Sequence, residues 1–113
     1  MRTFNLNDLV GESERGHQRW QEFLRARSLS VGLYRLQAGQ ADEQKPHAED
    51  EVYLVLRGKA SFRAGGQEQA VGPGSVIFVE RTLEHRFVNI TEDLTVLVFF
   101  APPEGSLQGG VEK

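Results

Sequence analysis

The stretch Gly39–Gly58, GQADEQKPHAEDEVYLVLRG, decides the fold. Its first part is polar and acidic, and it then becomes a nearly continuous apolar run, Val52–Leu56. A short apolar run between polar turns is typical of a strand buried in a closed sheet. We therefore expect a β-strand over 52–56, with a polar connector before it and a turn at Arg57-Gly58-Lys59 after it.

The β pattern extends on both sides of this stretch. Apolar and polar residues alternate from Leu29 to Arg35, which is the period of a strand. Trp20, Phe23 and Leu24 fit either a helix face or a strand edge, and residues 4–19 are expected to be irregular. Seven or eight short strands in roughly 80 residues predict an all-β sandwich or barrel. The further strands are expected over residues 60–63, 75–79, 85–90 and 94–100.

Composition limits the classes of protein that the chain can belong to. Its 113 residues suit one domain, expected over 1–113 with a core at about 22–101. A net charge of −3 without a basic cluster argues against nucleic acid as a partner. The absence of cysteine excludes disulfides and thiolate ligands. The longest apolar run, near Val96–Pro103, is far too short to span a bilayer, so we expect no membrane partner and a cytoplasmic location.

Two of the three histidines stand directly before or at predicted strands. His47 and Glu51 lie in KPHAEDE, and His85 lies in LEHRFVN. Two imidazoles and one carboxylate form a ligand set that holds catalytic divalent metals and leaves positions open. The alternatives are a solvated acidic loop for the first group and a strand-end histidine bonded to Glu84 for the second. Glu51 favours the metal site, because it directly precedes five apolar residues and a buried, unpaired carboxylate costs several kcal/mol.

The spacing of these residues also resembles two known motifs. Gly39-x5-Lys45-Pro46-His47-x3-Glu51-x6-Gly58 resembles the first cupin motif, Gly-x5-His-x-His-x3,4-Glu-x6-Gly. Gly74-x5-Glu80-Arg81-Thr82-x2-His85-x3-Asn89 is similar to the second, Gly-x5-Pro-x-Gly-x2-His-x3-Asn. The resemblance implies a small single-domain cupin of the Cupin_2 type. Its fold would be all-β, the cupin double-stranded β-helix or jelly-roll barrel, with a short N-terminal extension.

The resemblance implies a metal site inside the barrel. One divalent ion (iron, manganese, nickel, copper or zinc) would be held by His47, Glu51 and His85. The site would perform oxygenase- or isomerase-type chemistry on a small organic molecule. Tyr53 or Asn89 would fix the orientation of an imidazole.

The same resemblance implies a homodimer. Trp20 and Phe23, from the N-terminal part, are the candidates for its interface. The expected partners are therefore a second copy of the chain and a small-molecule ligand or substrate.

The departures from the motifs bear on function. Lys45 replaces the first histidine, and a protonated lysine has no lone pair for a metal. It is either a surface cation or an inward group that holds an anionic part of a substrate. Gln44 and Glu49 could each add an oxygen ligand. Thr82 replaces a glycine and tolerates positive φ poorly, so we expect the turn before His85 to be built differently.

Whether the chain is an enzyme stays open at this point. A non-enzymatic cupin could bind a small effector, with the metal incidental or absent. The Lys45 substitution favours that alternative. A purely structural barrel without metal is a third alternative, which the Thr82 substitution would favour.

Overall fold

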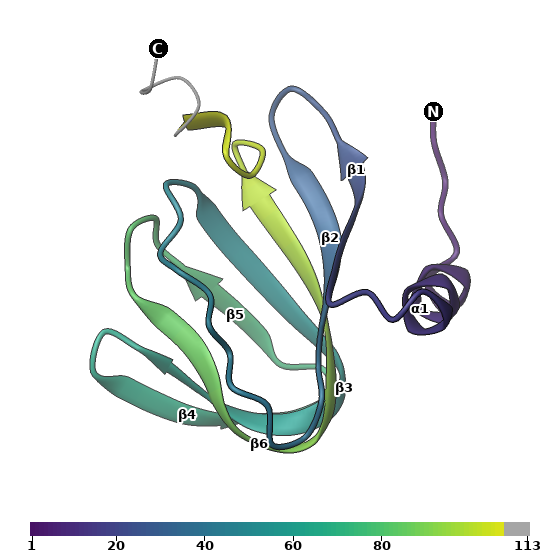
Figure 1. Ribbon diagram of the computed structural model, residues 1–113. Coiled ribbons are helices and arrows are strands. Elements are labelled where there is room, and N and C mark those ends of the chain that lie inside the picture. The colour runs from purple at the N-terminus through teal and green to yellow at the C-terminus, as the bar shows by residue number, and fades with distance from the viewer. Residues whose placement is uncertain (108–113) are drawn as a thin grey trace.

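A computed structural model describes residues 1–107 and shows an all-β architecture with one short helix at its N-terminal end (Figure 1). All strand pairs are antiparallel, which confirms the expected fold class. The described residues form six strands rather than seven or eight. The elements are α1 (Leu6–Arg15), β1 (Trp20–Arg25), β2 (Ser30–Leu36), β3 (Asp50–Ala64), β4 (Gln67–Val71), β5 (Val76–Val79) and β6 (His85–Ala101).

Two long strands, β3 and β6, form the centre of the structure. They pair from Asp50 beside Ala101 to Ala64 beside His85. The turn expected at Gly58 is wrong, because the chain continues there as a strand with a shifted register. Gly58 has φ +94°, and a Cβ at this position would collide with the Asp93 carbonyl oxygen of β6. Glycine therefore lets β3 bend closely over β6 instead of ending.

The bend divides the sheet into two layers that face each other. The first half of β3 pairs with β5, and its second half pairs with β4. The sheet order is β1-β2-β6-β3-β4, and Figure 1 shows it curving round an interior. Side chains of β3 alternate between buried and less buried positions, with Glu51, Tyr53 and Val55 buried. The buried residues of this interior are Leu36, Tyr53, Val55, Ala60, Phe62, Val79, Phe87, Ile90, Leu94, Val96, Val98 and Phe100.

The N-terminal segment that was expected to be irregular contains α1. Asn5 caps this helix by accepting a hydrogen bond from the backbone of its first turn. Leu9 and Val10 pack on Leu33 of β2, so tertiary packing outweighs the cost of about 1 kcal/mol for Gly11 inside a helix. Within the described part of the chain, no helix is long and apolar enough to cross a bilayer.

We predict that Gly58→Ala destabilises the protein by about 3 kcal/mol or more, since it combines left-handed strain with a backbone collision. Gly66→Ala is the matched control, because Gly66 has φ +83° but open space around its Cα. Its loss should be about 1 kcal/mol, from strain alone. Urea unfolding followed by circular dichroism measures both. Equal losses in the two variants would contradict the close approach of β3 and β6.

Candidate metal centre

His85 and Glu51 meet inside the barrel. His85 is the first residue of β6 and Glu51 is the second of β3. The Nε2 atom of His85 lies 2.9 Å from Oε2 of Glu51, and both side chains are 1% exposed. The structure thus brings together one predicted ligand from each motif.

The protonation of His85 follows from its other ring nitrogen. Nδ1 lies 2.6 Å from the carbonyl oxygen of Leu83, and a carbonyl only accepts, so Nδ1 donates. In the neutral imidazole Nε2 then carries a lone pair. Nε2 has no hydrogen-bond partner within residues 1–107, because the Glu51 oxygen is close but poorly aligned. The Leu83 carbonyl thus orients this ring, a role that was expected for Tyr53 or Asn89.

Electrostatics leave this pair in need of a positive charge. Burial acts to lower the pKa of His85, but the Glu51 carboxylate and the Leu83 carbonyl outweigh it, and the pKa is raised. A lone pair and a carboxylate at 2.9 Å repel each other unless a proton or a cation is shared between them. Nitrogen and oxygen ligands on one metal ion, each about 2.1 Å from it, lie about 3 Å apart when adjacent. The pair therefore fits two ligands of one metal.

His47 lies near this pair but not in contact with it. Its ring centroid is 6.3 Å from that of His85 and 5.0 Å from that of Phe100. Its Nδ1 is 3.9 Å from Oε2 of Glu104, too long for a hydrogen bond. Within the described chain, no three His, Asp or Glu side chains are close enough to hold a metal as they stand. The predicted set fits in chemical kind, and a three-ligand site requires movement of the His47 side chain.

Thr82 connects the two motifs. The expectation of a differently built turn is wrong, since Thr82 adopts φ 66°, the left-handed conformation that glycine favours. Its Oγ1 donates to the Arg81 carbonyl at 2.6 Å, and its N–H donates to the His47 carbonyl at 2.7 Å. This backbone bond joins the loop that carries His47 to the turn before His85.

A chain of buried hydrogen bonds supports Glu51. The Tyr53 hydroxyl lies 2.8 Å from Oε1 of Glu51 and 3.0 Å from Oε1 of Gln44, and shares its proton between them. Gln44 Nε2 donates to Oδ2 of Asp42 at 2.6 Å, and the Tyr34 hydroxyl donates to Oδ1 at 2.6 Å. Tyr53 thus contacts Glu51 rather than an imidazole, and Gln44 contacts Tyr53 and Asp42.

Sequence reasoning missed Asp42 and Glu104, and it considered Glu49 only as a possible further oxygen ligand. Asp42 is 3% exposed and also accepts a bond from the Phe87 backbone N–H, at 2.8 Å. Glu49 is 1% exposed, and neither carboxylate oxygen has a hydrogen-bond partner in the described chain. Burial, and then the charges of Glu22, Glu49 and Glu51, raise the pKa of Glu104, while His47 lowers it. The only sequence signal for Glu49 was its place between the predicted ligands.

Two other predicted residues lie away from the pair. Lys45 is exposed, which favours its interpretation as a surface cation. Asn89 is also exposed, with φ 51°, and it borders a surface groove with Lys59 and Thr91. The expectation that Asn89 orients an imidazole is therefore wrong.

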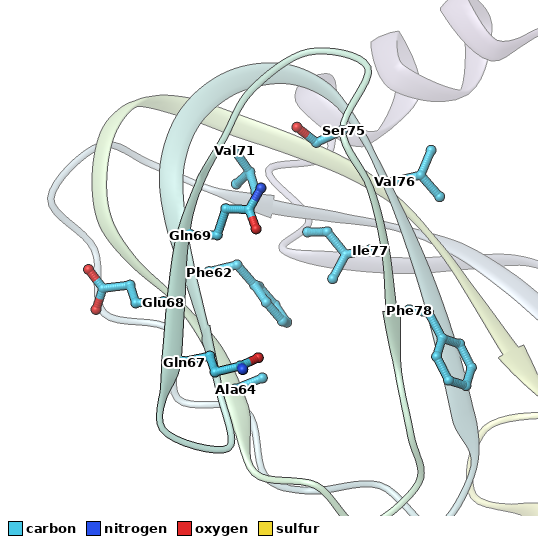
Figure 2. A pocket seen from close by; sticks show the side chains of 10 residues that line it. All are labelled: Phe62, Ala64, Gln67, Glu68, Gln69, Val71, Ser75, Val76, Ile77 and Phe78. Atoms are coloured by element: carbon cyan, nitrogen blue, oxygen red, sulfur yellow. The ribbon is translucent and has the colours of Figure 1, made fainter.

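Two cavities are candidates for ligand binding, and neither His85 nor Glu51 lines them. The smaller one, about 150 Å³, is lined by Gln44, His47, Tyr53 and Glu104 together with apolar side chains. The larger one, about 850 Å³, lies between β4 and β5, where Phe62 and Ile77 face each other (Figure 2). Its one acidic lining residue, Glu68, is paired with Arg63 on the surface. His47 and Glu104 line the smaller cavity, whereas His85 borders a separate cavity of about 270 Å³ with Glu84 and Arg86.

Phe62 stands between the larger cavity and His85. It lines that cavity, and its ring centroid is 5.9 Å from that of His85. Its side chain is buried, and it packs on Tyr53 and Phe87 at ring-centroid distances of 5.5 and 4.9 Å. The aromatic cluster thus separates the larger cavity from the His85–Glu51 pair.

Comparisons with known proteins agree with this geometry. The family model for the cupin domain matches residues 32–100. The chain is 47% identical over 104 residues to an uncharacterized protein of Streptomyces coelicolor, SCO3923, covering 92% of this chain and 99% of that one.

Solved structures show the same fold. TT1209 from Thermus thermophilus is 27% identical, with a TM-score of 0.70 over 91% of this chain and 99% of that one. DMSP lyase DddQ from Ruegeria pomeroyi DSS-3 is 21% identical, with a TM-score of 0.66 over 75% of this chain. The matched part spans 48% of that lyase chain, about half its length.

The two bent, antiparallel layers define a double-stranded β-helix, with a pair of motif residues facing each other inside it. A cupin from Methanocaldococcus jannaschii, described as having a double-stranded β-helix fold, is 14% identical, with a TM-score of 0.66 over 74% of this chain. The chain belongs to the cupin family.

We predict that neither tyrosine ionises near pH 10 in the folded protein. Burial and then Asp42 raise the pKa of Tyr34, and burial and then Glu51 raise that of Tyr53, both above the ordinary value of 10. The neutral phenols therefore stabilise the fold fully below pH 10, and this contribution is lost as the pH rises through the higher folded values. A pH titration that follows tyrosinate absorbance tests this prediction, and the variants Tyr34→Phe and Tyr53→Phe assign each absorbance change to one tyrosine. Reversible ionisation near pH 10 with native circular dichroism would contradict the buried network.

Proposed function

We propose that this protein binds one divalent metal ion on His47, Glu51 and His85, and uses it in oxygenase- or isomerase-type chemistry on a small organic molecule. The observation that carries the proposal is the buried Nε2 atom of His85, without a hydrogen-bond partner within residues 1–107 and 2.9 Å from a Glu51 oxygen. Iron, manganese, nickel, copper and zinc all accept such ligands. His47 would complete the set by turning its ring toward the pair.

Each surrounding residue has a defined part in such a site. A bound metal supplies Lewis-acid or, if redox-active, oxygen-activating chemistry. The Leu83 carbonyl keeps the proton of His85 on Nδ1, which leaves Nε2 as the ligand atom. The Tyr53 hydroxyl engages Oε1 of Glu51 and leaves Oε2 toward His85. Because its pKa is raised, first by burial, Tyr53 stays protonated and keeps its hydrogen bond to Glu51.

The cavity limits the size of the substrate. Its volume of about 150 Å³ is well below the 300–1,000 Å³ that drug-sized ligands commonly occupy. Trp20, Val98 and Phe100 form apolar walls, while Gln44 and Glu104 offer polar contacts. A compact molecule with one or two polar groups fits this lining.

The larger cavity supports a second candidate function. Its lining combines apolar Phe62 and Ile77 with the amides of Gln67 and Gln69 (Figure 2). These groups suit binding of a neutral molecule without catalysis. A non-enzymatic cupin of this kind would bind its effector whether or not a metal is present. The likeness to the lyase DddQ, at 21% identity, reflects the fold and favours neither function.

We also propose a homodimer formed through the outer face of β5, β3 and β6. Phe78, Val52 and Phe99 lie side by side there on neighbouring strands, and Phe78 and Phe99 are 63% and 36% exposed. The row carries no charge, so two copies can meet on it without desolvating ions. Trp20, expected at the interface, instead packs within the chain on Tyr34 and Phe100.

A metal analysis tests the site. We expect about one divalent metal per chain in the purified protein, measured by elemental mass spectrometry. His85→Ala and His47→Ala should each lose at least about tenfold in affinity, because each removes a ligand from a preformed barrel. His17→Ala, at an exposed histidine, is the matched control and should keep the metal.

Three results would argue against the metal site. These are no metal after reconstitution with each of the five ions, full occupancy in His85→Ala, or unchanged activity in the metal-free protein. Full affinity of His47→Ala for a small ligand identified by thermal-shift screening would favour the effector-binding alternative.

The oligomeric state tests the outer face. Light scattering should give about twice the chain mass of 12.7 kDa for the wild type. Phe78→Asp should give the monomer mass, because two carboxylates would be buried against apolar side chains. Leu6→Asp changes another exposed apolar residue, 39% exposed on α1, and should remain dimeric. A monomeric wild type at tens of micromolar, or a dimeric Phe78→Asp, would refute this interface.

A further inference from the structure

We propose that Glu49 is an additional ligand of the metal ion, in the place that Lys45 leaves without a donor, and that it shifts the site toward Mn²⁺ or Fe²⁺. This inference rests on the proposed metal site at His47, Glu51 and His85. Glu49 stands two residues after His47 and two residues before Glu51. Glu49 would thus be a further donor atom source in that site and would select the class of metal ion bound there.

The burial of Glu49 carries the inference. The residue is 1% exposed, and both carboxylate oxygens are buried without a hydrogen-bond partner within residues 1–107. The lysine and arginine ion pairs of the described chain join other carboxylates. A carboxylate buried without a partner costs several kcal/mol, so chains rarely keep one unless it binds a cation. A bound cation would supply the compensation that residues 1–107 do not provide for Glu49.

The neighbours of Glu49 place it at the metal-binding end of the barrel. The charges of Glu49, Glu51 and His47 all act on Glu104, which lines the smaller cavity with His47. Buried Nε2 of His85, also unpartnered in the described chain, lies beside Glu51 at the same place. Unsatisfied groups of both kinds, carboxylate oxygen and imidazole nitrogen, thus belong to the same part of the described chain, and side-chain movement would be needed to bring them onto one ion.

Charge balance and ligand type then indicate the metal. Two carboxylates neutralise a divalent ion, which lowers the cost of burying it. Oxygen ligands favour Mn²⁺ and Fe²⁺ relative to Ni²⁺ and Cu²⁺, which gain more from imidazole. Replacing an imidazole donor with Glu49 therefore moves the preference of the site toward the harder ions.

The test compares Mn²⁺ and Ni²⁺ binding to the metal-stripped protein by calorimetry, with electron paramagnetic resonance to count free Mn²⁺. We expect Glu49→Gln to weaken Mn²⁺ at least about tenfold and Ni²⁺ less than about threefold. Glu43→Gln, at an exposed acidic residue of the same connector, is the control and should change neither. Glu49→His keeps a donor, and should bind Ni²⁺ more tightly than the wild type while losing Mn²⁺ affinity. It also tests the inference if Glu49→Gln does not fold.

The outcomes separate this inference from the metal site itself. Wild-type Mn²⁺ affinity in Glu49→Gln, with binding lost in His85→Ala, would overturn the role of Glu49 alone. An unchanged Mn²⁺-to-Ni²⁺ ratio in Glu49→His would do the same. Failure of the wild type to bind Mn²⁺ would also overturn the role of Glu49, and the metal site itself would fall only if none of the five ions bound.

Discussion

The bend in the β3–β6 pair lets a residue from each of the two motifs meet inside the barrel. In the ladder, Glu51 pairs with Phe100 and Ala64 pairs with His85, so the two site residues stand thirteen positions apart along β3. In a flat sheet that separation is roughly 40 Å. The structure instead brings their side chains to 2.9 Å, because the strands curve over at Gly58 and close the two layers on each other. Everything at the site depends on this curvature.

The buried polar groups of the interior fall into two sets, those with hydrogen-bond partners and those without. Asp42 receives bonds from Tyr34, Gln44 and Phe87, and behaves as a structural anchor. Glu49 and the Nε2 atom of His85 receive none in the described chain. The same interior thus supplies one buried carboxylate, that of Asp42, with all the hydrogen-bond donors it needs. The unsatisfied groups therefore indicate where the barrel meets something other than itself.

The sequence predicted the fold class and the pairing of Glu51 with His85, because strand periodicity and motif spacing are local signals. It failed at Gly58, where a glycine in a strand bend has the same pattern as a glycine in a turn. The helix α1 was missed because its stability comes from Leu33, a residue more than ten positions away.

The connector residues were harder to place from sequence. A polar loop has the same composition whether it is solvated or buried, and the partners that bury Asp42 come from β2 and β6. Glu49 was similarly weighed as part of a solvated acidic run, because its burial depends on the closure of the barrel. Thr82 shows the converse, since an unfavourable residue can be held in a left-handed turn by surrounding hydrogen bonds.

The anchoring of Asp42 also constrains how this sequence can vary in length. The residue has to reach the Phe87 backbone on one side and the Tyr34 hydroxyl on the other, while His47 stays tied to Thr82. An insertion between these two anchored points would displace one of them. The hairpin tip at Gly65-Gly66 is exposed, and the bond from the Gly65 N–H to the Glu84 carbonyl is long at 3.3 Å, so the tip has room to lengthen. Insertions and deletions among related sequences should therefore occur at that tip. The connector that carries Asp42 and His47 should keep a constant length, although it is not a strand.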